Sequence, residues 1–130
     1  MNAGLDTSVI VRYVVGVPEE QAAAARRLID AAGETLAISD LAVGESYHVL
    51  RHHYGVPPAR AIGVLLAFLR EPGVRPTGAA LRVLEGLAGG AGGSGLMDRL
   101  LNADYADAGL AFVTFDRAAP RLPGARLLTA

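Results

Sequence analysis

The order of apolar and polar residues along the chain alternates between two patterns. In some stretches, apolar residues recur at the spacing of one helix face. In others, several apolar residues stand in a row, as in a short buried strand. Helical stretches and short apolar runs follow one another over most of the sequence. This alternation predicts a parallel sheet with helices on both faces.

The predicted helices have recognisable ends. Proline and acidic residues open the alanine-rich stretch that begins at Pro18, and Gly33 closes it. Hydroxyl or acidic side chains can cap other helices, because their oxygens accept free N–H groups of the first turn. The predicted helices run from Thr7 or Ser8 to about Val15, from Pro18 to Gly33, from a cap at Asp40 to near Gly55, from Pro57 to Pro72, from a cap at Thr77 through Leu87, and, after a cap at Ser94, from about Leu96 to Ala108.

Short strands are predicted between these helices. They comprise the residues before Asp6 and the segments 35–39, 74–76, 110–116 and 125–129. Together the elements predict an α/β protein, a three-layer α/β/α sandwich with a central parallel sheet of roughly four to five short strands. At 130 residues, the chain is expected to form one domain, residues 1–130. The glycine-rich stretch 89–95 is predicted to be a loop.

Four acidic residues are predicted to lie at one edge of that sheet. Asp6 and Asp116 end predicted strands, whereas Glu45 and Asp98 lie early in helices that follow a strand or a loop. Ligands of open parallel sheets bind beyond the carboxyl ends of the strands. The four carboxylates are therefore candidate catalytic and metal-binding residues.

Two of these acids share a helix face with apolar residues. Helical spacing places Glu45 with Leu41 and Val49, whose side chains are expected to face the core. The same spacing relates Asp98 to Leu101, Asn102 and Tyr105. A carboxylate at the edge of a buried face costs free energy unless it is paired or binds a metal.

Converging carboxylates would repel one another when ionised, and a divalent cation would relieve that repulsion. The chain has no cysteine and no histidine pair beside the acids, so oxygen ligands favour Mg²⁺ or Mn²⁺ over zinc. Cysteine nucleophiles and disulfide frameworks are excluded for the same reason. All 12 basic residues are arginine, which excludes Schiff-base chemistry on lysine.

Charge and hydropathy limit the cellular locations and partners that the sequence predicts. The formal net charge of −1 gives no sign of a polybasic membrane binder or a nucleic-acid coat protein. No apolar run approaches the ~18 residues of a membrane span, and the N-terminus lacks the basic region of a signal peptide. We therefore expect a soluble, cytoplasmic protein that does not bind membranes.

Four short motifs occur in the order LDTSVIV, SDLAVGESYHVL, GLMDRLL and VTFD. Together they resemble the PIN-domain ribonucleases and, more narrowly, the VapC toxins of bacterial VapBC toxin–antitoxin modules. The resemblance implies a metal-dependent endoribonuclease that hydrolyses RNA phosphodiester bonds with a water activated by Mg²⁺ or Mn²⁺. It also implies a VapB-like antitoxin as partner and a homodimer.

The resemblance assigns roles to individual residues. Two small hydroxyl residues, Ser8 and Thr114, would support the acids. The acidic quartet that would hold one or two metal ions comprises Asp6, Glu45, Asp98 and Asp116.

The arginines, the histidines and one apolar segment are weaker candidates for functional roles. The arginines proposed to contact RNA phosphates are Arg12, Arg51, Arg99 and Arg117. His48, His52 and His53 lack an acid that would complete a ligand set, so we interpret them as surface or dimer-contact residues rather than a zinc site. The apolar residues from Ile62 to Leu69 are expected to belong to the core or to a subunit interface.

Three alternatives share some of these features. A haloacid-dehalogenase-like phosphatase would need a second aspartate at position 8, which is Ser8, and a lysine. A response-regulator receiver domain would also need a lysine. A catalytically inactive PIN-like module that binds RNA or protein remains the alternative to an enzyme, although all four acids are present.

Overall fold

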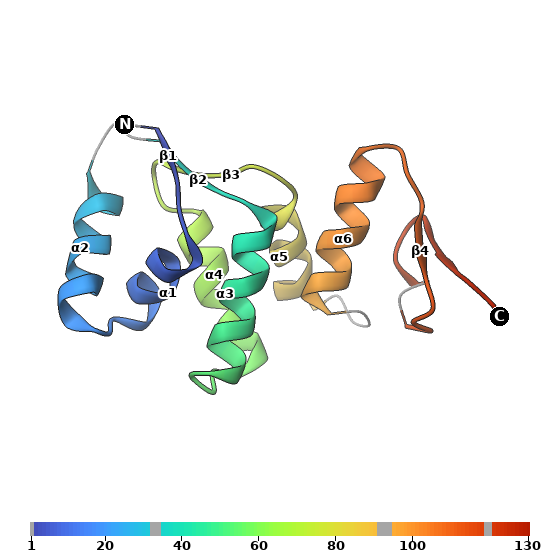
Figure 1. The fold of residues 1–130 in the computed structure, drawn as a ribbon, viewed down its shortest axis with the longest axis horizontal. Helices are drawn as coiled ribbons and strands as arrows, with labels where there is room; N and C mark the ends of the chain where they lie inside the picture. The colour runs from blue at the N-terminus through green and yellow to red at the C-terminus, as the bar shows by residue number, and fades with distance from the viewer. Residues whose placement is uncertain (1, 32–34, 91–94, 119–120) are drawn as a thin grey trace.

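In the computed structural model, helices alternate with short strands (Figure 1). The structure describes residues 2–31, 35–90, 95–118 and 121–130. The helices are α1 (Thr7–Val15), α2 (Glu19–Asp30), α3 (Asp40–His52), α4 (Pro58–Leu69), α5 (Ala80–Ala88) and α6 (Leu96–Asp107). The strands are β1 (Ala3–Gly4), β2 (Leu36–Ile38), β3 (Val74–Pro76), β4 (Phe112–Thr114) and β5 (Ala125–Leu127). None of the described helices is long and apolar enough to cross a membrane.

The strands are all parallel, as the alternating pattern predicts, which confirms the α/β class. They form two sheets, however, where one central sheet was expected. β2 lies between β1 and β3 in the first sheet, and β4 pairs with β5 in the second. The second sheet packs against α6, on the far side of that helix from α3 (Figure 1).

The second sheet is held in this position by α6. The Asn102 side-chain amide donates a hydrogen bond of 3.0 Å to the Pro123 carbonyl, and the rings of Tyr105 and Phe112 lie 6.0 Å apart. Phe112 and Leu122 are buried in a small cluster of their own. These contacts explain why the predicted single sheet is divided between two places.

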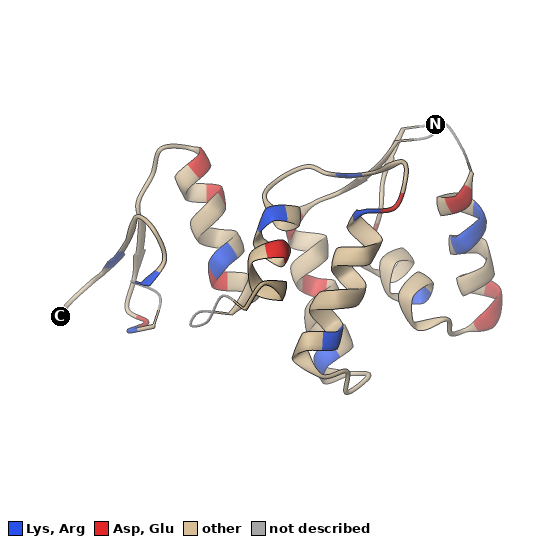
Figure 2. Ribbon diagram, turned by 180° about the vertical axis from the view of Figure 1, so that it is seen from behind, with Lys and Arg blue, Asp and Glu red and all other residues tan. Residues whose placement is uncertain are grey.

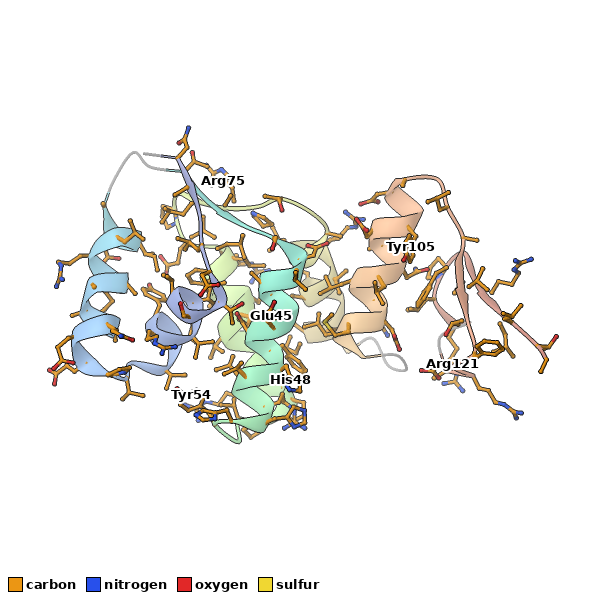
Figure 3. The ribbon with its side chains drawn as sticks, viewed as in Figure 1. Glu45, His48, Tyr54, Arg75, Tyr105 and Arg121 are labelled. Carbon is orange, nitrogen blue, oxygen red and sulfur yellow. The ribbon has the colours of Figure 1, made fainter. Side chains whose placement is uncertain are left out.

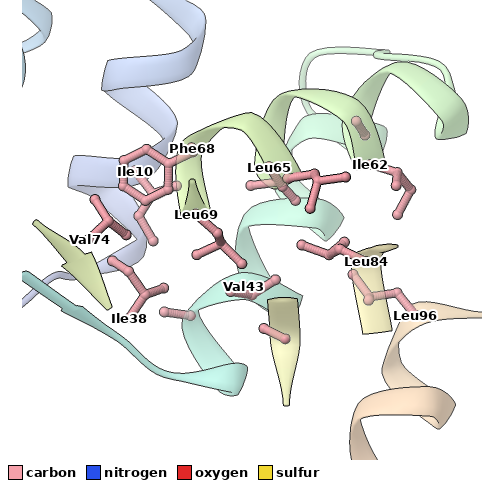
Figure 4. Close-up of a cluster of buried hydrophobic side chains, with 14 of the residues drawn as sticks. Ile10, Ile38, Val43, Ile62, Leu65, Phe68, Leu69, Val74, Leu84 and Leu96 are labelled. Atoms are coloured by element: carbon pink, nitrogen blue, oxygen red, sulfur yellow. The ribbon is translucent and has the colours of Figure 1, made fainter. Parts of the chain in front are cut away.

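The main core lies between the first sheet and the helices (Figure 4). Phe68, Leu65 and Leu69 of α4 are buried against Ile10 of α1 and Val74 of β3. The apolar face of α4, which the sequence assigned to the core or to a subunit interface, therefore belongs to the core of a single chain.

Asp40 plays a different part from the one expected. Ser39 caps α3, since its hydroxyl accepts the Ala42 N–H at 3.1 Å. The Asp40 carboxylate instead accepts the N–H groups of Ala79 and Ala80, at 3.2 and 3.0 Å. Asp40 thus satisfies the free N–H groups at the start of α5, a role that the sequence had given to Thr77.

Other predicted helix ends differ from the observed ones or lie outside the described residues. Thr77 donates a hydrogen bond of 3.4 Å to the Ile38 carbonyl and does not cap α5. The expected stop at Gly33, the expected cap at Ser94 and part of the glycine-rich stretch 89–95 lie outside the described residues. Gly95 occupies the N-cap position of α6.

We expect Gly78→Ala to destabilise the fold by about 1–3 kcal/mol. A Cβ atom at this position would lie 2.5 Å from one Asp40 oxygen, so the carboxylate would be displaced from the start of α5. Urea denaturation of the variant measures the loss. The matched control is Gly63→Ala on α4, where a Cβ atom meets nothing within 4 Å and removing a helical glycine favours folding. Equal free energies of unfolding for the two variants would contradict the proposed role of Asp40.

Candidate active site

Asp6 follows β1 and begins α1. Its carboxylate accepts two hydrogen bonds from Ser8, from the backbone N–H at 3.1 Å and from the hydroxyl at 2.6 Å. Asp6, and not Thr7 or Ser8, is therefore the cap of α1. The Ser8 hydroxyl and then the Ser8 N–H lower the pKa of Asp6, because both bonds favour the ionised carboxylate.

Glu45 lies on α3 beside the start of α1 (Figure 3). The Thr7 hydroxyl donates a hydrogen bond of 3.4 Å to the Glu45 carboxylate. Since Thr7 directly follows Asp6, this bond brings the first two predicted acids to the same part of the molecule. The sequence alone gave no role to Thr7.

The prediction that Glu45 shares its helix face with core residues was wrong. Leu41, which shares its face, is 64% exposed, and Glu45 is exposed as well. The side of α3 that enters the core carries Val43, Ser46 and Leu50 instead. Glu45 is thus a solvated carboxylate, free of the desolvation cost that the sequence pattern predicted.

Asp98 lies in the first turn of α6, half buried. α6 packs against α3 at Gly44, where a Cβ atom would collide with the Met97 sulfur. Gly44 precedes Glu45 and Met97 precedes Asp98, so this close contact brings together the helix turns that carry the second and third acids. A glycine inside a helical pattern was the available signal for such an approach.

The face of α6 around Asp98 carries both buried and exposed side chains. Asn102 is buried, as its spacing from Asp98 suggested, whereas Leu101 and Tyr105 are 41% and 38% exposed. Asp98 therefore lies between a buried and an exposed side of the helix.

Asp116 lies apart from the other three acids. It follows β4, is exposed, and accepts the Ala118 N–H at 2.9 Å. The Thr114 hydroxyl accepts the Asp116 N–H at 3.0 Å, so Thr114 orders the turn rather than the carboxylate itself. Since β4 lies beyond α6, one copy of the chain does not place Asp116 beside Asp6 (Figure 1).

The side chains of the candidate site are carboxylates and hydroxyls, which are ligands that suit a hard divalent cation. The Asp6 carboxylate is also held in its ionised form by Ser8. Within the part of the chain that the structure describes, however, no three acidic or histidine side chains lie close enough to hold an ion. Contacts of neighbouring residues link the turns that carry Asp6, Glu45 and Asp98.

A hollow of about 360 Å³ opens between α1 and α3 and reaches Thr7 and Ser8, the hydrogen-bond partners of Glu45 and Asp6. Its lining includes Thr7, Ser8, Arg12, His53 and Tyr54. The hollow combines a cation that can pair with phosphate and aromatic rings that can stack on bases. Asp6 and Glu45 do not line it themselves, but the residues that hydrogen-bond to them do.

The four predicted arginines lie on separate elements, and Figure 2 shows basic residues distributed over several helices and the C-terminal segment. Arg12 donates to the Gln21 side chain at 2.7 Å, and Arg51 donates to the Val56 carbonyl at 3.1 Å. Arg99 lies on α6 next to Asp98, and Arg117 directly follows Asp116. Arg12 is the one that lines the hollow beside the acids.

The three histidines are exposed on α3 and just after it, as expected for surface residues. The rings of His48 and His52 lie 4.5 Å apart, and His53 packs edge-on against Tyr54. Among the described residues, no acid joins them in a group that could hold a metal.

We expect Ser8→Ala to raise the pKa of Asp6 toward its ordinary value of 3.8, because the strongest hydrogen bond to the carboxylate is lost. A lowered pKa stabilises the fold above the unfolded-state pKa, and this stabilisation is lost as the pH falls through the folded-state pKa. In the variant, this pH-dependent stabilisation should therefore be smaller, and its loss should be complete at a higher pH than in the wild type. NMR titration of the Asp6 carboxyl carbon measures the pKa. Thr7→Ala, which leaves both Ser8 bonds intact, should keep the low value; an unchanged pKa in Ser8→Ala would contradict this account.

The sequence matches the model of a protein family described as "PIN domain" over residues 4–125. No curated protein sequence matches the chain. A crystal structure of VapBC2 from Rickettsia felis bound to a DNA fragment from their promoter is similar at 19% identity, with 98% of each chain covered and a TM-score of 0.41.

Proposed function

The chain belongs to the PIN-domain family, and on that basis we propose that it is a metal-dependent endoribonuclease, the toxin of a toxin–antitoxin pair. PIN domains are generally nucleases that hydrolyse RNA or DNA. The choice of RNA, of a VapB-like antitoxin as partner and of a toxic role rests on the resemblance of the four sequence motifs to VapC toxins.

The observation that carries the proposal is the linkage of three acids through neighbouring residues. The Thr7 hydroxyl joins the start of α1 to Glu45. The Gly44–Met97 contact joins the turn that carries Glu45 to the turn that carries Asp98. Elements far apart in the sequence thus meet through residues that neighbour these acids, which supports the proposal that the acids share a cation.

Asp6, Glu45 and Asp98 are the residues that would hold Mg²⁺ or Mn²⁺. When bound, such an ion lowers the pKa of a water and stabilises charge on a phosphodiester. The protein's own groups orient the reactants. Ser8 fixes the Asp6 carboxylate in its ionised form, and Thr7 orients Glu45.

The hollow between α1 and α3 is the proposed RNA site. Arg12 would pair with a phosphate, while Tyr54 and His53 offer rings on which an unpaired base can stack. Single-stranded RNA suits this site, because stacking on a side chain requires a base that is free of its neighbours. Arg117 is exposed and directly follows Asp116. It would therefore contact the substrate only if Asp116 takes part in the same site.

One observation favours the alternative, a catalytically inactive module that binds RNA or protein. In a single copy, the described acids do not form a group that could hold an ion. Cleavage and binding assays on the same protein separate the two functions.

We expect Asp6→Asn or Asp98→Asn to reduce RNA cleavage by about 100-fold or more while the domain stays folded, because each removes a charged oxygen ligand. Cleavage of a labelled single-stranded RNA in Mn²⁺ measures the effect, and circular dichroism checks the fold. The matched control is Asp107→Asn on the same helix, which loses only an exposed ion pair with Arg82.

The same assay tests the metal. EDTA should silence the wild type, and added Mg²⁺ or Mn²⁺ should restore it. Full activity in either acid variant would refute the site assignment, and cleavage that persists in EDTA would refute the metal. RNA binding without any cleavage would favour the inactive module.

The toxic role predicts that strong expression of the wild type arrests bacterial growth and that Asp6→Asn does not. The antitoxin encoded beside the chain should relieve the arrest when it is expressed with the wild type. Viable counts after induction, with protein levels checked by immunoblot, provide the measurement. Normal growth at a verified high level of folded wild type would argue for another cellular role.

A further inference from the structure

The end of α3 carries two histidines on one face. His48 and His52 are four residues apart, a spacing that places two side chains one above the other on a helix. Both are exposed, and their ring centres lie 4.5 Å apart with the ring planes at 44°. Within the part of the chain that the structure describes, neither ring makes a hydrogen bond or an ion pair. The two imidazoles are therefore available to a ligand from solution.

The separation of the rings suits two imidazoles that bind one metal ion. A metal–nitrogen bond of about 2 Å places the ring centres of two such ligands roughly 5 Å apart when they occupy neighbouring positions on the ion. The observed 4.5 Å is close to that distance. Two histidines at the same helical spacing bind zinc in the H-E-x-x-H motif of metalloproteases. Rotation of the two side chains, with the backbone unchanged, would turn both rings toward a common ion.

The backbone that carries the pair is held in place. Leu50, between the two histidines, is 1% exposed and belongs to the core. Directly after the helix, the N–H groups of His53 and Val56 donate to the carbonyls of Val49 and Leu50, both at 2.9 Å. A pair of ligands on a fixed backbone loses little freedom when it binds an ion, which favours binding.

The charges around the pair favour a cation. His52 is the last residue of α3, and the C-terminal end of a helix carries a partial negative charge. Glu45 lies on the same helix three residues before His48, so the two side chains are neighbours on its surface (Figure 3). Arg51 is adjacent in sequence to His52 but donates to the Val56 carbonyl at 3.1 Å. A bound cation therefore meets a favourable helix end and a nearby carboxylate.

The type of ligand selects the class of ion. Imidazole nitrogen suits zinc, nickel and copper, whereas magnesium and manganese prefer oxygen ligands. The chain has no cysteine, so no thiolate competes for such an ion. A closed zinc site needs about four protein ligands, and the described residues supply no such group. Two imidazoles are instead the basis of an open site, in which water fills the remaining positions.

The third histidine lies outside the pair. His53 follows His52 directly, which places it about 100° around the helix axis. Its ring packs edge-on against Tyr54, with the ring centres 4.7 Å apart. His53 is thus a neighbouring imidazole that does not share the face of the other two.

We propose that His48 and His52 form an open chelating site for one transition-metal ion of the zinc, nickel and copper class. The site differs from the carboxylate site in the hardness of its ligands, so the two sites would take different ions from the same solution. A bound ion links the last turns of α3 and stabilises the folded chain, because it binds the native state more tightly than the unfolded one. Neither RNA nor cleavage is needed for this binding.

NMR titration with Zn²⁺ tests the site on the wild type. The chain has three histidines, so the ring signals of each can be followed separately. In an excess of Mg²⁺, which occupies carboxylates, Zn²⁺ should shift the signals of His48 and His52 together and leave those of His53 in place. Equal shifts of all three histidines, or displacement of Zn²⁺ by Mg²⁺, would refute the site.

Single variants test whether the two histidines act as a pair. His48→Ala and His52→Ala should each weaken the binding of Ni²⁺ by about tenfold or more, because the second imidazole of a chelate binds at a high effective concentration. Isothermal titration calorimetry on chains without an affinity tag measures the effect. The matched control is His53→Ala, which removes an imidazole outside the pair and should keep the wild-type affinity. Wild-type affinity in either pair variant would overturn the proposal.

Thermal unfolding covers the case of a variant that folds poorly. Ni²⁺ should raise the Tm of the wild type and of His53→Ala, and EDTA should reverse the shift. The double variant, His48→Ala with His52→Ala, should show no such rise, and a rise as large as that of the wild type would refute the site. If the wild type does not cleave RNA, the proposed function fails while these measurements still decide the metal site.

Discussion

The parallel pairing of β2 with its neighbours is the constraint on which the rest of the structure depends. Because β1, β2 and β3 run in the same direction, the segments that leave them start from one edge. α1 begins there at Asp6 and α3 begins there at Ser39. Asp40 then holds the start of α5 to the same edge through two backbone N–H groups. A few hydrogen bonds in very short strands thus position three helices.

The relative positions of the acids in the candidate site depend on residues that are not themselves acids. Thr7 links α1 to α3, and the absence of a side chain at Gly44 lets α6 approach α3. Neither residue carries the charge that would bind an ion. The carboxylates are exposed or half buried, so they pay little desolvation cost and depend on these neutral contacts for their positions.

Much of this arrangement was accessible from the sequence, because it depends on local signals. Prolines, glycines and helical spacing predicted α2, α4 and α6 near their observed bounds, and apolar runs predicted β2 and β4. The face of Glu45 was misjudged, because the spacing of Leu41 and Val49 also fits an exposed stripe beside the buried residues Val43, Ser46 and Leu50. The cap at Asp40 serves α5, 39 residues away, and such a long-range bond leaves no periodic trace in the sequence. The split of the sheet was equally hidden, since it depends on which strand edges meet.

The contact at Gly44 has a consequence for how related chains diverge. A single added methyl group there would meet the Met97 sulfur, so the Met97 side chain would have to take another position between α3 and α6. A substitution that changes no charge could therefore disturb the candidate site while the acidic quartet stays complete. The presence of four acids in a sequence is thus only one part of such a site, because the position of the turn that carries Asp98 depends on how α6 packs at Gly44.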